Sequence, residues 1–402
     1  MPTPVAAIMC AVLAQGPLGN PTAPAANPVT EPKRLLGKIL FWDEQLSSSN
    51  TVSCGTCHTP QAGGGDLRRA RNPGSDGLFM SGDDVFGSPG LILADGQNNF
   101  SPEPAFAFAS QVTARASNSA YMGAYSNLNF WDGRAGPSLV DPITGQTLIA
   151  GGAALEAQVL GPPVSNVEMA HFGRSWGDVV SKLGGAQPLA LADQVPADVA
   201  AALADSPSYA TLFERAFGTP QVTPGRVAMA IATYERTLVP NQTPWDRYVA
   251  GNTSALTPRQ VQGMIAFNSD AAKCADCHGG NRFTDNAFHN IGVRPSSEDP
   301  GARACRASRA ISASSAHPRS ATRASARRSS TTVAQRRCAR RSTSTPACPA
   351  RSRSSPTTLI RACSTSRSQT TTPTRSSSSL PAASLIRASP EPCRPLTTRA
   401  CG

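Results

Sequence analysis

The sequence predicts a mostly α-helical protein with two similar units. Three observations support this fold class. The motif C-x-x-C-H occurs at residues 54–58 and again at residues 274–278, and each copy follows apolar residues at helical spacing. Helix-start patterns recur between the two motifs, whereas we find no convincing alternation of apolar and polar residues that would indicate β-strands. Residues 301–402 form a third, compositionally different segment without aromatic residues.

Residues 1–30 are predicted to form a leader and a linker. The apolar run from Val5 to Ala14 suits the hydrophobic region of an export signal, but no basic residue precedes it. A truncated export signal and a Pro/Ala-rich leader therefore both stay open, and a linker rich in Pro, Ala and Asn follows at residues 15–32. No segment approaches the ~18 apolar residues that cross a membrane, so we predict no membrane span.

The helices are predicted in the following order. Residues 31–42 place Leu35, Leu36, Ile39 and Leu40 on one helical face that leads into the first motif. Gly- and Pro-rich breakers fill residues 60–105, so we predict a loop insertion at residues 60–110. Further helices are expected at these places: residues 175–183, residues 209–217, a helix capped by Thr223 with Pro224 as its first residue, and a helix that starts at Thr257-Pro258 and runs through Phe267.

The motif C-x-x-C-H is typical of covalent attachment of a c-type haem. Two thiols add to the vinyl groups of one porphyrin, and the adjoining histidine supplies an axial nitrogen to iron. The candidate residues are Cys54, Cys57 and His58 in the first copy, and Cys274, Cys277 and His278 in the second. A four-cysteine zinc site would place its pairs ~15–20 residues apart, and a thioredoxin-like pair would need a βαβ context. Neither alternative fits, so we predict two c-type haems, and their covalent attachment favours export to the periplasm.

Five segments carry a resemblance to a known family. They are, in chain order, LGKILFWDEQLSSSNTVSCGTCH, NLNFWDGRA, VEMA, IATYERTLV and FTDNAFHNIG. Over residues 31–300 the chain resembles the bacterial di-haem cytochrome c peroxidases, a family that includes the oxidase that matures methylamine dehydrogenase. The resemblance implies two cytochrome-c-like domains: a peroxide-facing N-terminal domain at residues 31–240 and the start of an electron-accepting C-terminal domain at residues 241–300.

The resemblance also implies roles for four residues around the first haem. Trp131 matches the tryptophan that lies between the haems and couples them. Gln158 and Glu168 match the distal glutamine and glutamate, and Pro162 matches a distal-pocket proline. A carboxylate above iron can move a proton between the two peroxide oxygens, while an amide can hold the peroxide by hydrogen bonds.

Two departures from the family pattern affect the prediction. No histidine occurs between His58 and His171, so the histidine that caps the N-terminal haem in some members is missing, and this haem is expected to be open to peroxide without reductive activation. Arg115 matches a family arginine, but Ala116 replaces an asparagine of the interdomain calcium site. A Gly-rich loop carries Asp76, Asp83 and Asp84 as calcium loops do, but it lacks the full ligand pattern, so a calcium site and a flexible acidic loop both stay open.

The tail differs from the rest of the chain. Residues 301–402 contain 19 Arg, no Lys and one acid, Glu391, so they carry +18 of the total charge of +11 and leave −7 for residues 1–300. A nucleic-acid-binding arm, a disordered tail and a segment translated out of frame are the alternatives. We favour a frameshift, because the neighbouring frame of a GC-rich gene can encode family-like segments here. The C-terminal haem domain would then be truncated, and this chain itself could be inactive.

The sequence therefore predicts a di-haem peroxidase that reduces hydrogen peroxide to water with electrons from a small c-type cytochrome or cupredoxin. The alternative within the same family is a di-haem electron carrier or protein-oxidising enzyme. We predict no nucleic-acid partner, and a homodimer remains open.

Overall fold

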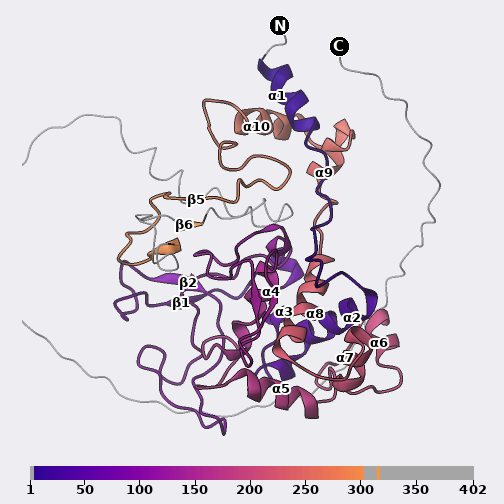
Figure 1. The fold of residues 1–402 in the computed structure, drawn as a ribbon. Helices are drawn as coiled ribbons and strands as arrows, with labels where there is room; N and C mark the ends of the chain where they lie inside the picture. The colour runs from indigo at the N-terminus through magenta and orange to yellow at the C-terminus, as the bar shows by residue number, and fades with distance from the viewer. Residues whose placement is uncertain (1–3, 303–314, 317–402) are drawn as a thin grey trace, which may run out of the picture. The chain divides into compact units, whose positions relative to one another are not determined.

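The structure is a computed structural model that describes residues 4–302 and 315–316 (Figure 1). These residues all belong to one compact unit, Met1–Arg340, and a second unit, Arg341–Gly402, lies outside the described residues. The predictions of a frameshift and of a disordered tail fall outside the described residues as well.

Helices dominate the regular structure of the described residues, which confirms the prediction of a mostly helical chain. The α-helices are α1 (Pro4–Leu13), α2 (Glu31–Trp42), α3 (Cys54–Cys57), α4 (Ala154–Val159), α5 (Trp176–Gly185), α6 (Ala197–Ala202), α7 (Tyr209–Phe217), α8 (Pro224–Arg236), α9 (Pro244–Val249) and α10 (Pro258–Phe267). The 3₁₀-helices are η1 (Glu44–Leu46), η2 (Pro60–Ala62), η3 (Gly123–Tyr125), η4 (Pro162–Val164) and η5 (Thr253–Ala255).

The helix starts that the sequence predicts are confirmed in detail. The Thr223 side chain accepts a hydrogen bond from the backbone N–H of Arg226, and Pro224 is the first residue of α8. Thr257 caps α10 in the same way, through the backbone N–H of Gln260. These positions are predictable because a hydroxyl cap and an N1 proline act within one turn of the chain.

Three short antiparallel strand pairs lie within the described part of the chain, although its sequence shows no convincing strand pattern. They are β1 (Ala70–Asn72) with β2 (Val85–Gly87), β3 (Leu139–Val140) with β4 (Thr147–Ile149), and β5 (Phe288–His289) with β6 (Ser315–Ala316). The first pair lies inside the predicted loop insertion and sets Arg71 opposite Phe86, with the guanidinium 5.1 Å from the ring centroid. Strands of two or three residues are too short to show an alternating pattern.

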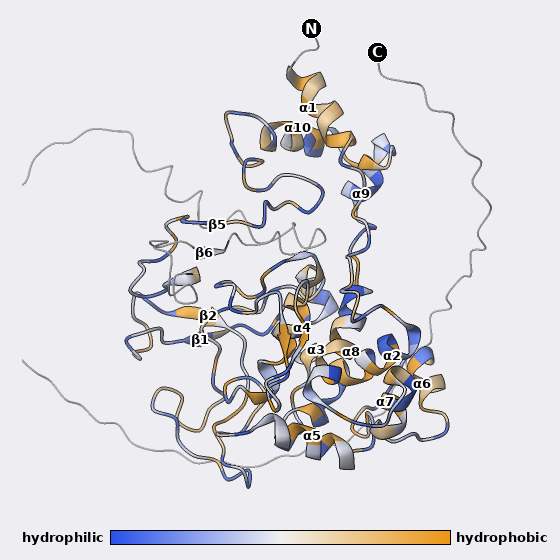
Figure 2. Ribbon diagram, in the orientation of Figure 1, coloured by the Kyte–Doolittle hydropathy of each residue, from blue (hydrophilic) through white to orange (hydrophobic). Residues whose placement is uncertain are grey.

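The main core forms where α2 and α8 cross. A Cβ added to Gly37 would overlap the carbonyl oxygen of Ala230, so the missing side chain allows the two backbones to approach closely. Figure 2 shows apolar residues on α4 and α8 in this region. Phe41 from α2 and Phe213 from α7 are buried there, together with Leu183 from α5.

A smaller apolar cluster joins the N-terminal helix to two later helices. Val12 from α1 packs with Tyr248 and Val249 from α9 and with Met264 from α10. No helix among the described residues has the length and apolar character needed to cross a membrane.

The segment before α2 contributes a buried polar residue. Asn27 is fully buried and donates from Nδ2 to Glu156 Oε1 at 2.8 Å and to the carbonyl oxygen of Met229 at 3.0 Å. Its Oδ1 accepts from Lys33 Nζ at 3.0 Å. The linker prediction for residues 15–32 gave no indication of these contacts, because their partners lie far along the chain.

Candidate functional site

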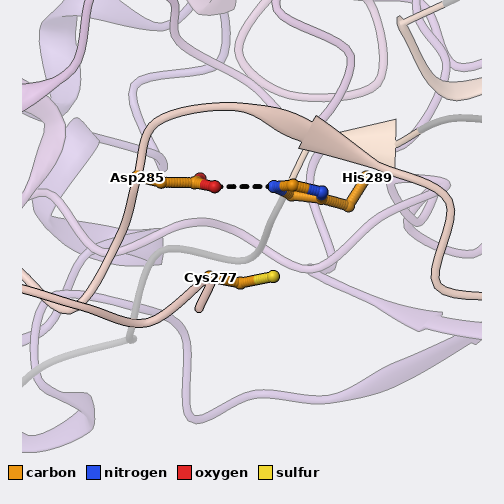
Figure 3. A group of neighbouring side chains, drawn as sticks. All are labelled: Cys277, Asp285 and His289. Carbon is orange, nitrogen blue, oxygen red and sulfur yellow. Dashed lines mark hydrogen bonds and ion pairs between the residues drawn. The ribbon is translucent and has the colours of Figure 1, made fainter. Parts of the chain in front are cut away.

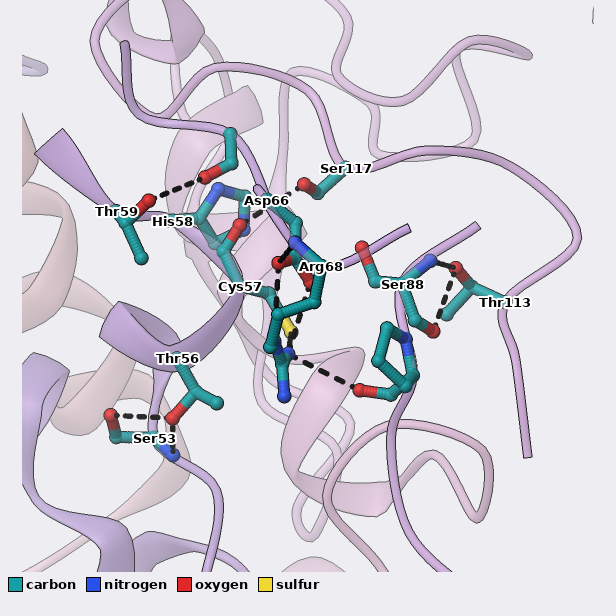
Figure 4. Close-up of polar contacts among 12 residues, drawn as sticks. Ser53, Thr56, Cys57, His58, Thr59, Asp66, Arg68, Ser88, Thr113 and Ser117 are labelled. Carbon is teal, nitrogen blue, oxygen red and sulfur yellow. Dashed lines mark hydrogen bonds and ion pairs between the residues drawn. The ribbon is translucent and has the colours of Figure 1, made fainter. Parts of the chain in front are cut away.

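The first C-x-x-C-H motif folds as a single helical turn. In Figure 4 the backbone N–H of Ser53 donates to Thr56 Oγ1, at 2.9 Å, at the start of α3. The backbone N–H of His58 continues the turn by bonding the Cys54 carbonyl oxygen at 3.1 Å. Gly55 is required at the second position, because a Cβ there would overlap the Trp42 ring of α2. This turn brings Cys54, Cys57 and His58 to one side.

The His58 ring is oriented by a backbone carbonyl. Its Nδ1 lies 2.9 Å from the carbonyl oxygen of Gly64. A carbonyl oxygen can only accept, so Nδ1 carries the proton and Nε2 presents its lone pair. Burial lowers the pKa of His58, against the opposing effect of the Gly64 carbonyl. The imidazole is thus held neutral, as an iron ligand requires.

Cys57 has a polar neighbour that the sequence did not indicate. Arg68 Nη2 lies 3.2 Å from Cys57 Sγ and 3.0 Å from Asp66 Oδ2 (Figure 4). Burial raises the pKa of the Cys57 thiol to about 12, although Arg68 opposes this shift. The Cys57 side chain is therefore a neutral, protonated thiol, which is the state from which a thioether bond to a haem vinyl group forms.

A cavity of about 660 Å³ opens beside this motif, within the usual size range of cofactor pockets. Its walls include the three motif side chains and all four residues that the resemblance assigned to the first haem. The predicted site residues that line it are Cys54, Cys57, His58, Trp131, Gln158, Pro162 and Glu168. The structure therefore brings together residues that are separated by more than a hundred positions in the sequence.

The residues around this cavity fit a covalently attached haem. Both thiols and the imidazole reach the same space, and the imidazole turns its unprotonated nitrogen away from the Gly64 carbonyl. A buried oxygen in the wall, Glu235 Oε2, has no hydrogen-bond partner among the described residues. Buried polar atoms usually have partners, so this atom is consistent with a bound group or water in the cavity.

Trp131 is followed by a carboxylate that pairs with two arginines. Asp132 Oδ2 accepts from Arg115 Nη1 at 2.8 Å and from Arg134 Nη1 at 3.0 Å. Arg115 also pairs with Asp299 at 2.7 Å, so a residue near the end of the described chain contacts this wall. Burial raises the pKa of Asp132, but the hydrogen bonds from Arg115 and Arg134 and the charges of both arginines together outweigh burial, and the pKa lies below its ordinary value.

The distal residues are carried by two short helices and a turn. Gln158 lies in α4, Pro162 begins η4, and the backbone N–H of Glu168 bonds the Ser165 carbonyl oxygen at 3.1 Å. The buried Arg174 joins this region to η1, because its Nη1 donates to the carbonyl oxygens of Leu46, Pro163 and Met169 at 2.8, 3.1 and 3.3 Å. Sequence analysis missed Arg174, since its partners are backbone atoms without a sequence pattern.

In the second C-x-x-C-H motif the histidine makes the same two kinds of backbone contact as His58, but its cysteines do not lie in an α-helix like α3. The backbone N–H of His278 bonds the Cys274 carbonyl oxygen at 2.8 Å, and His278 Nδ1 lies 3.2 Å from the Phe283 carbonyl oxygen. Phe267 lies near His278, with ring centroids 6.3 Å apart. The lining of the 660 Å³ cavity does not include Cys274, Cys277 or His278, so the two motifs occupy separate places.

Asp285 and His289 lie close to Cys277, as Figure 3 shows. One donor atom from each of the three residues lies within 4.8 Å of the others, and His289 Nε2 is 2.8 Å from Asp285 Oδ2. Sequence analysis quoted this segment only as part of the resemblance and did not single out either residue.

The predicted calcium loop uses its carboxylates in other ways. Asp83 accepts from the backbone N–H groups of Ser75 and Asp76 at 2.7 and 3.1 Å, and Asp84 pairs with Arg71. Asp76 accepts from the Leu78 backbone at 2.8 Å. Among the described residues, the cluster of metal-ligating groups is the one at Cys277 rather than this loop, and calcium stays a prediction.

The chain is similar in sequence to known proteins. The sequence model of the family described as di-haem cytochrome c peroxidase matches residues 31–254. The methylamine utilization protein MauG of Methylophilus methylotrophus is 30% identical over 272 residues, which cover 67% of this chain and 59% of the relative. The cytochrome c peroxidase Ccp of Escherichia coli strain K12 is 28% identical over 272 residues, which cover 67% of this chain and 42% of the relative.

A solved structure is similar as well. The crystal structure of a MauG-like protein associated with microbial copper homeostasis aligns with a TM-score of 0.47 and 18% identity, over 75% of this chain and 72% of that chain. The chain spans less than two thirds of the length of the curated relatives named above. Since the family model covers more than half of the sequence, this chain belongs to the di-haem cytochrome c peroxidase family.

Proposed function

We propose that this protein reduces hydrogen peroxide to water with electrons that a small c-type cytochrome or cupredoxin delivers through a second haem. One observation carries the proposal: Gln158 and Glu168 line the same cavity as Cys54, Cys57 and His58. An acid–base residue and a hydrogen-bonding amide therefore face the space in which a covalently held haem would lie.

The residues of this cavity have distinct proposed roles. When bound, the haem supplies an iron centre that accepts peroxide and passes electrons to it. His58 Nε2 ligates the iron, and the Gly64 carbonyl fixes the imidazole orientation. Glu168 moves a proton from the near to the far peroxide oxygen, Gln158 holds the peroxide, and Pro162 limits the space available to water.

The second motif supports the electron path. Cys274, Cys277 and His278 hold the second haem, and Trp131 couples it electronically to the first. In this proposal residues 31–240 form the peroxidatic domain and residues 241–300 begin the electron-transfer domain. The protein acts in the periplasm in this proposal.

Haem attachment is the first test. The purified full-length protein should stain for covalently bound haem after denaturation. Cys54→Ser combined with Cys57→Ser should remove about half of the stain, and the matching Cys274→Ser and Cys277→Ser pair should remove the other half. A chain whose stain is unchanged by the first pair does not hold haem at Cys54 and Cys57.

Peroxide turnover is the second test. With a reduced donor, Glu168→Gln should lower kcat by about 10²–10⁴-fold, the usual contribution of a positioned acid–base group. Glu214→Gln is the matched control, because Glu214 is exposed on α7, and it should leave the rate unchanged. Equal rates in wild type and Glu168→Gln would remove Glu168 from the mechanism.

A second candidate function is oxidation of another protein. It is favoured by the similarity to methylamine utilization proteins, because the resembled family includes the oxidase that matures methylamine dehydrogenase. The two functions differ in what consumes the oxidising equivalents. A peroxidase oxidises a small reduced donor rapidly, whereas a protein-oxidising enzyme changes the mass of a protein substrate and turns over slowly with the donor.

A further inference from the structure

Glu235 is a buried acid in the wall of the cavity beside Cys54. It is the penultimate residue of α8, and it is 6% exposed. It lines the same cavity as Cys54 and Gln158. Its Oε2 atom is buried and has no hydrogen-bond partner among the described residues. None of the roles proposed above uses this carboxyl group.

Among the described residues, the cation beside Glu235 is already paired and does not balance the charge of an ionised Glu235 carboxylate. The neighbouring Arg236 is bound to Glu156 of α4 by two hydrogen bonds of 2.7 and 2.9 Å, so its charge is already matched. The other titratable groups that face Glu235 are Tyr234 on its own helix and the Cys54 thiol of α3. Glu235 therefore faces Arg236, whose charge is paired with the carboxylate of Glu156, and two neutral side chains.

This environment favours the protonated carboxyl group. An ionised carboxylate without a partner is costly to bury, and such groups retain a proton instead. Burial is the largest cause that raises the pKa of Glu235, to about 8, with Arg236 opposing it and Glu156 adding to it. A buried acid with this property changes its proton occupancy when the charge close to it changes.

We propose that Glu235 Oε2 binds a proton from solvent when the haem held by Cys54, Cys57 and His58 gains an electron, and releases it on oxidation; this inference rests on the proposed function. The electron comes from the small redox protein. The proton forms one O–H bond on Oε2, so the net charge of the buried region stays constant. It arrives through the cavity, whose wall includes the half-exposed Arg134.

The direction of the effect follows from electrostatics. Each electron adds a negative charge inside a low-dielectric region, which strengthens the binding of a proton to a nearby carboxylate. Proton uptake on reduction makes the midpoint potential of the haem fall as pH rises. The limiting slope is about 59 mV for each tenfold change in proton concentration, the one-electron value.

The test is a redox titration of the haem-loaded full-length protein between pH 6 and pH 9, followed by the visible spectrum. Wild type should show a falling potential with pH across part of this range. Glu235→Gln keeps the shape of the side chain but cannot titrate, so its slope should drop to less than half of the wild-type slope. Glu214→Gln, on the surface of α7, should keep the wild-type slope. Equal slopes in wild type and Glu235→Gln would overturn the inference.

Infrared difference spectra give a second readout that needs no peroxide turnover. The reduced-minus-oxidised spectrum of wild type at the pH of steepest slope should contain a positive band from a protonated buried carboxyl group. That band should be missing in Glu235→Gln and present in Glu214→Gln. A band that survives in Glu235→Gln assigns the proton to another acid and overturns the inference.

The two proposals fail in distinguishable ways. A protein that turns over peroxide but shows the same slope with and without Glu235 loses only this inference. A protein that shows the Glu235-dependent slope but does not reduce peroxide loses the proposed reaction and keeps the proton site. A protein without haem at Cys54 and Cys57 loses both.

Discussion

Arg236 and Glu156 form a bidentate ion pair in the protein interior. Their nitrogen–oxygen distances are 2.7 and 2.9 Å, and both side chains are almost fully buried. Asn27 donates a third hydrogen bond to the same carboxylate. The pair joins α4, which carries Gln158, to α8, which lines the cavity with Glu235, so it ties two walls of the proposed site together.

Removal of Arg236 should be strongly destabilising. Arg236→Met leaves Glu156 buried without its cation, and loss of one partner from a buried pair costs about 3–5 kcal/mol. The free energy of unfolding from urea titration should fall by this amount. Arg215→Met on the exposed face of α7 should change it by no more than about 0.5 kcal/mol. A small effect at Arg236 would show that the pair is not formed in the folded protein.

The crossing of α2 and α8 should not tolerate a methyl group at Gly37. Gly37→Ala places a Cβ on the Ala230 carbonyl oxygen and should lower the free energy of unfolding by about 1–3 kcal/mol, as overpacking does. Gly184→Ala is the matched control, because a Cβ at Gly184 in α5 meets nothing within 4 Å. The control should raise stability by up to about 1 kcal/mol through helix propensity, and thermal unfolding distinguishes the two signs.

The buried hydroxyl of Tyr209 should contribute measurably to stability. It donates to Asp43 Oδ2 at 2.6 Å in the core, and hydrogen bonds to charged groups are worth about 1.5–3 kcal/mol. Tyr209→Phe should cost that amount in urea titration. Tyr248→Phe, equally buried, removes a hydroxyl whose contact is the weak acceptor Met9 Sδ at 3.8 Å, and it should cost less than half as much.

The pair between α2 and α6 should contribute stability only above acidic pH. The hydrogen bond from Lys38 is the main cause that lowers the pKa of Asp198, from an ordinary value of 3.8 to about 2. Because the folded pKa lies below the unfolded one, the stabilisation is complete above about pH 4 and is lost as pH falls through about 2. Asp198 is 37% exposed in its side chain, so Asp198→Asn should cost less than about 1 kcal/mol at pH 7. The difference between wild type and variant should shrink from pH 5 to pH 3, and a constant difference would contradict the assignment.

Local patterns predicted the helices well. Residues 31–42 and 209–217 form helices as expected, because their apolar periodicity and caps lie within the elements themselves. The strand pair β1–β2 was missed, since its register depends on Arg71 and Phe86 meeting across a Gly-rich segment. The residues next to Arg71 and Phe86 in the sequence give no indication of that contact.

The candidate site likewise contains residues that sequence patterns predicted and residues that they could not predict. Cys54, Cys57 and His58 could be predicted as a candidate site because the C-x-x-C-H motif is a local pattern along the chain. The resemblance supplied Gln158 and Glu168, which line the same cavity. Arg68 and Arg174 could not be predicted, because one contacts a sulfur and the other contacts carbonyl oxygens that only the fold brings near.

The contacts of Asn27 bear on the order in which the chain can fold during synthesis. Its partner Met229 follows it by 202 residues, so translation at about 5–20 residues per second separates the two by about 10–40 s. Until α8 has emerged from the ribosome, Asn27, Lys33 and Glu156 have no completed network to enter. The first C-x-x-C-H motif lies between Asn27 and Met229 in the sequence. It is therefore synthesised well before α8, the helix that completes the main core.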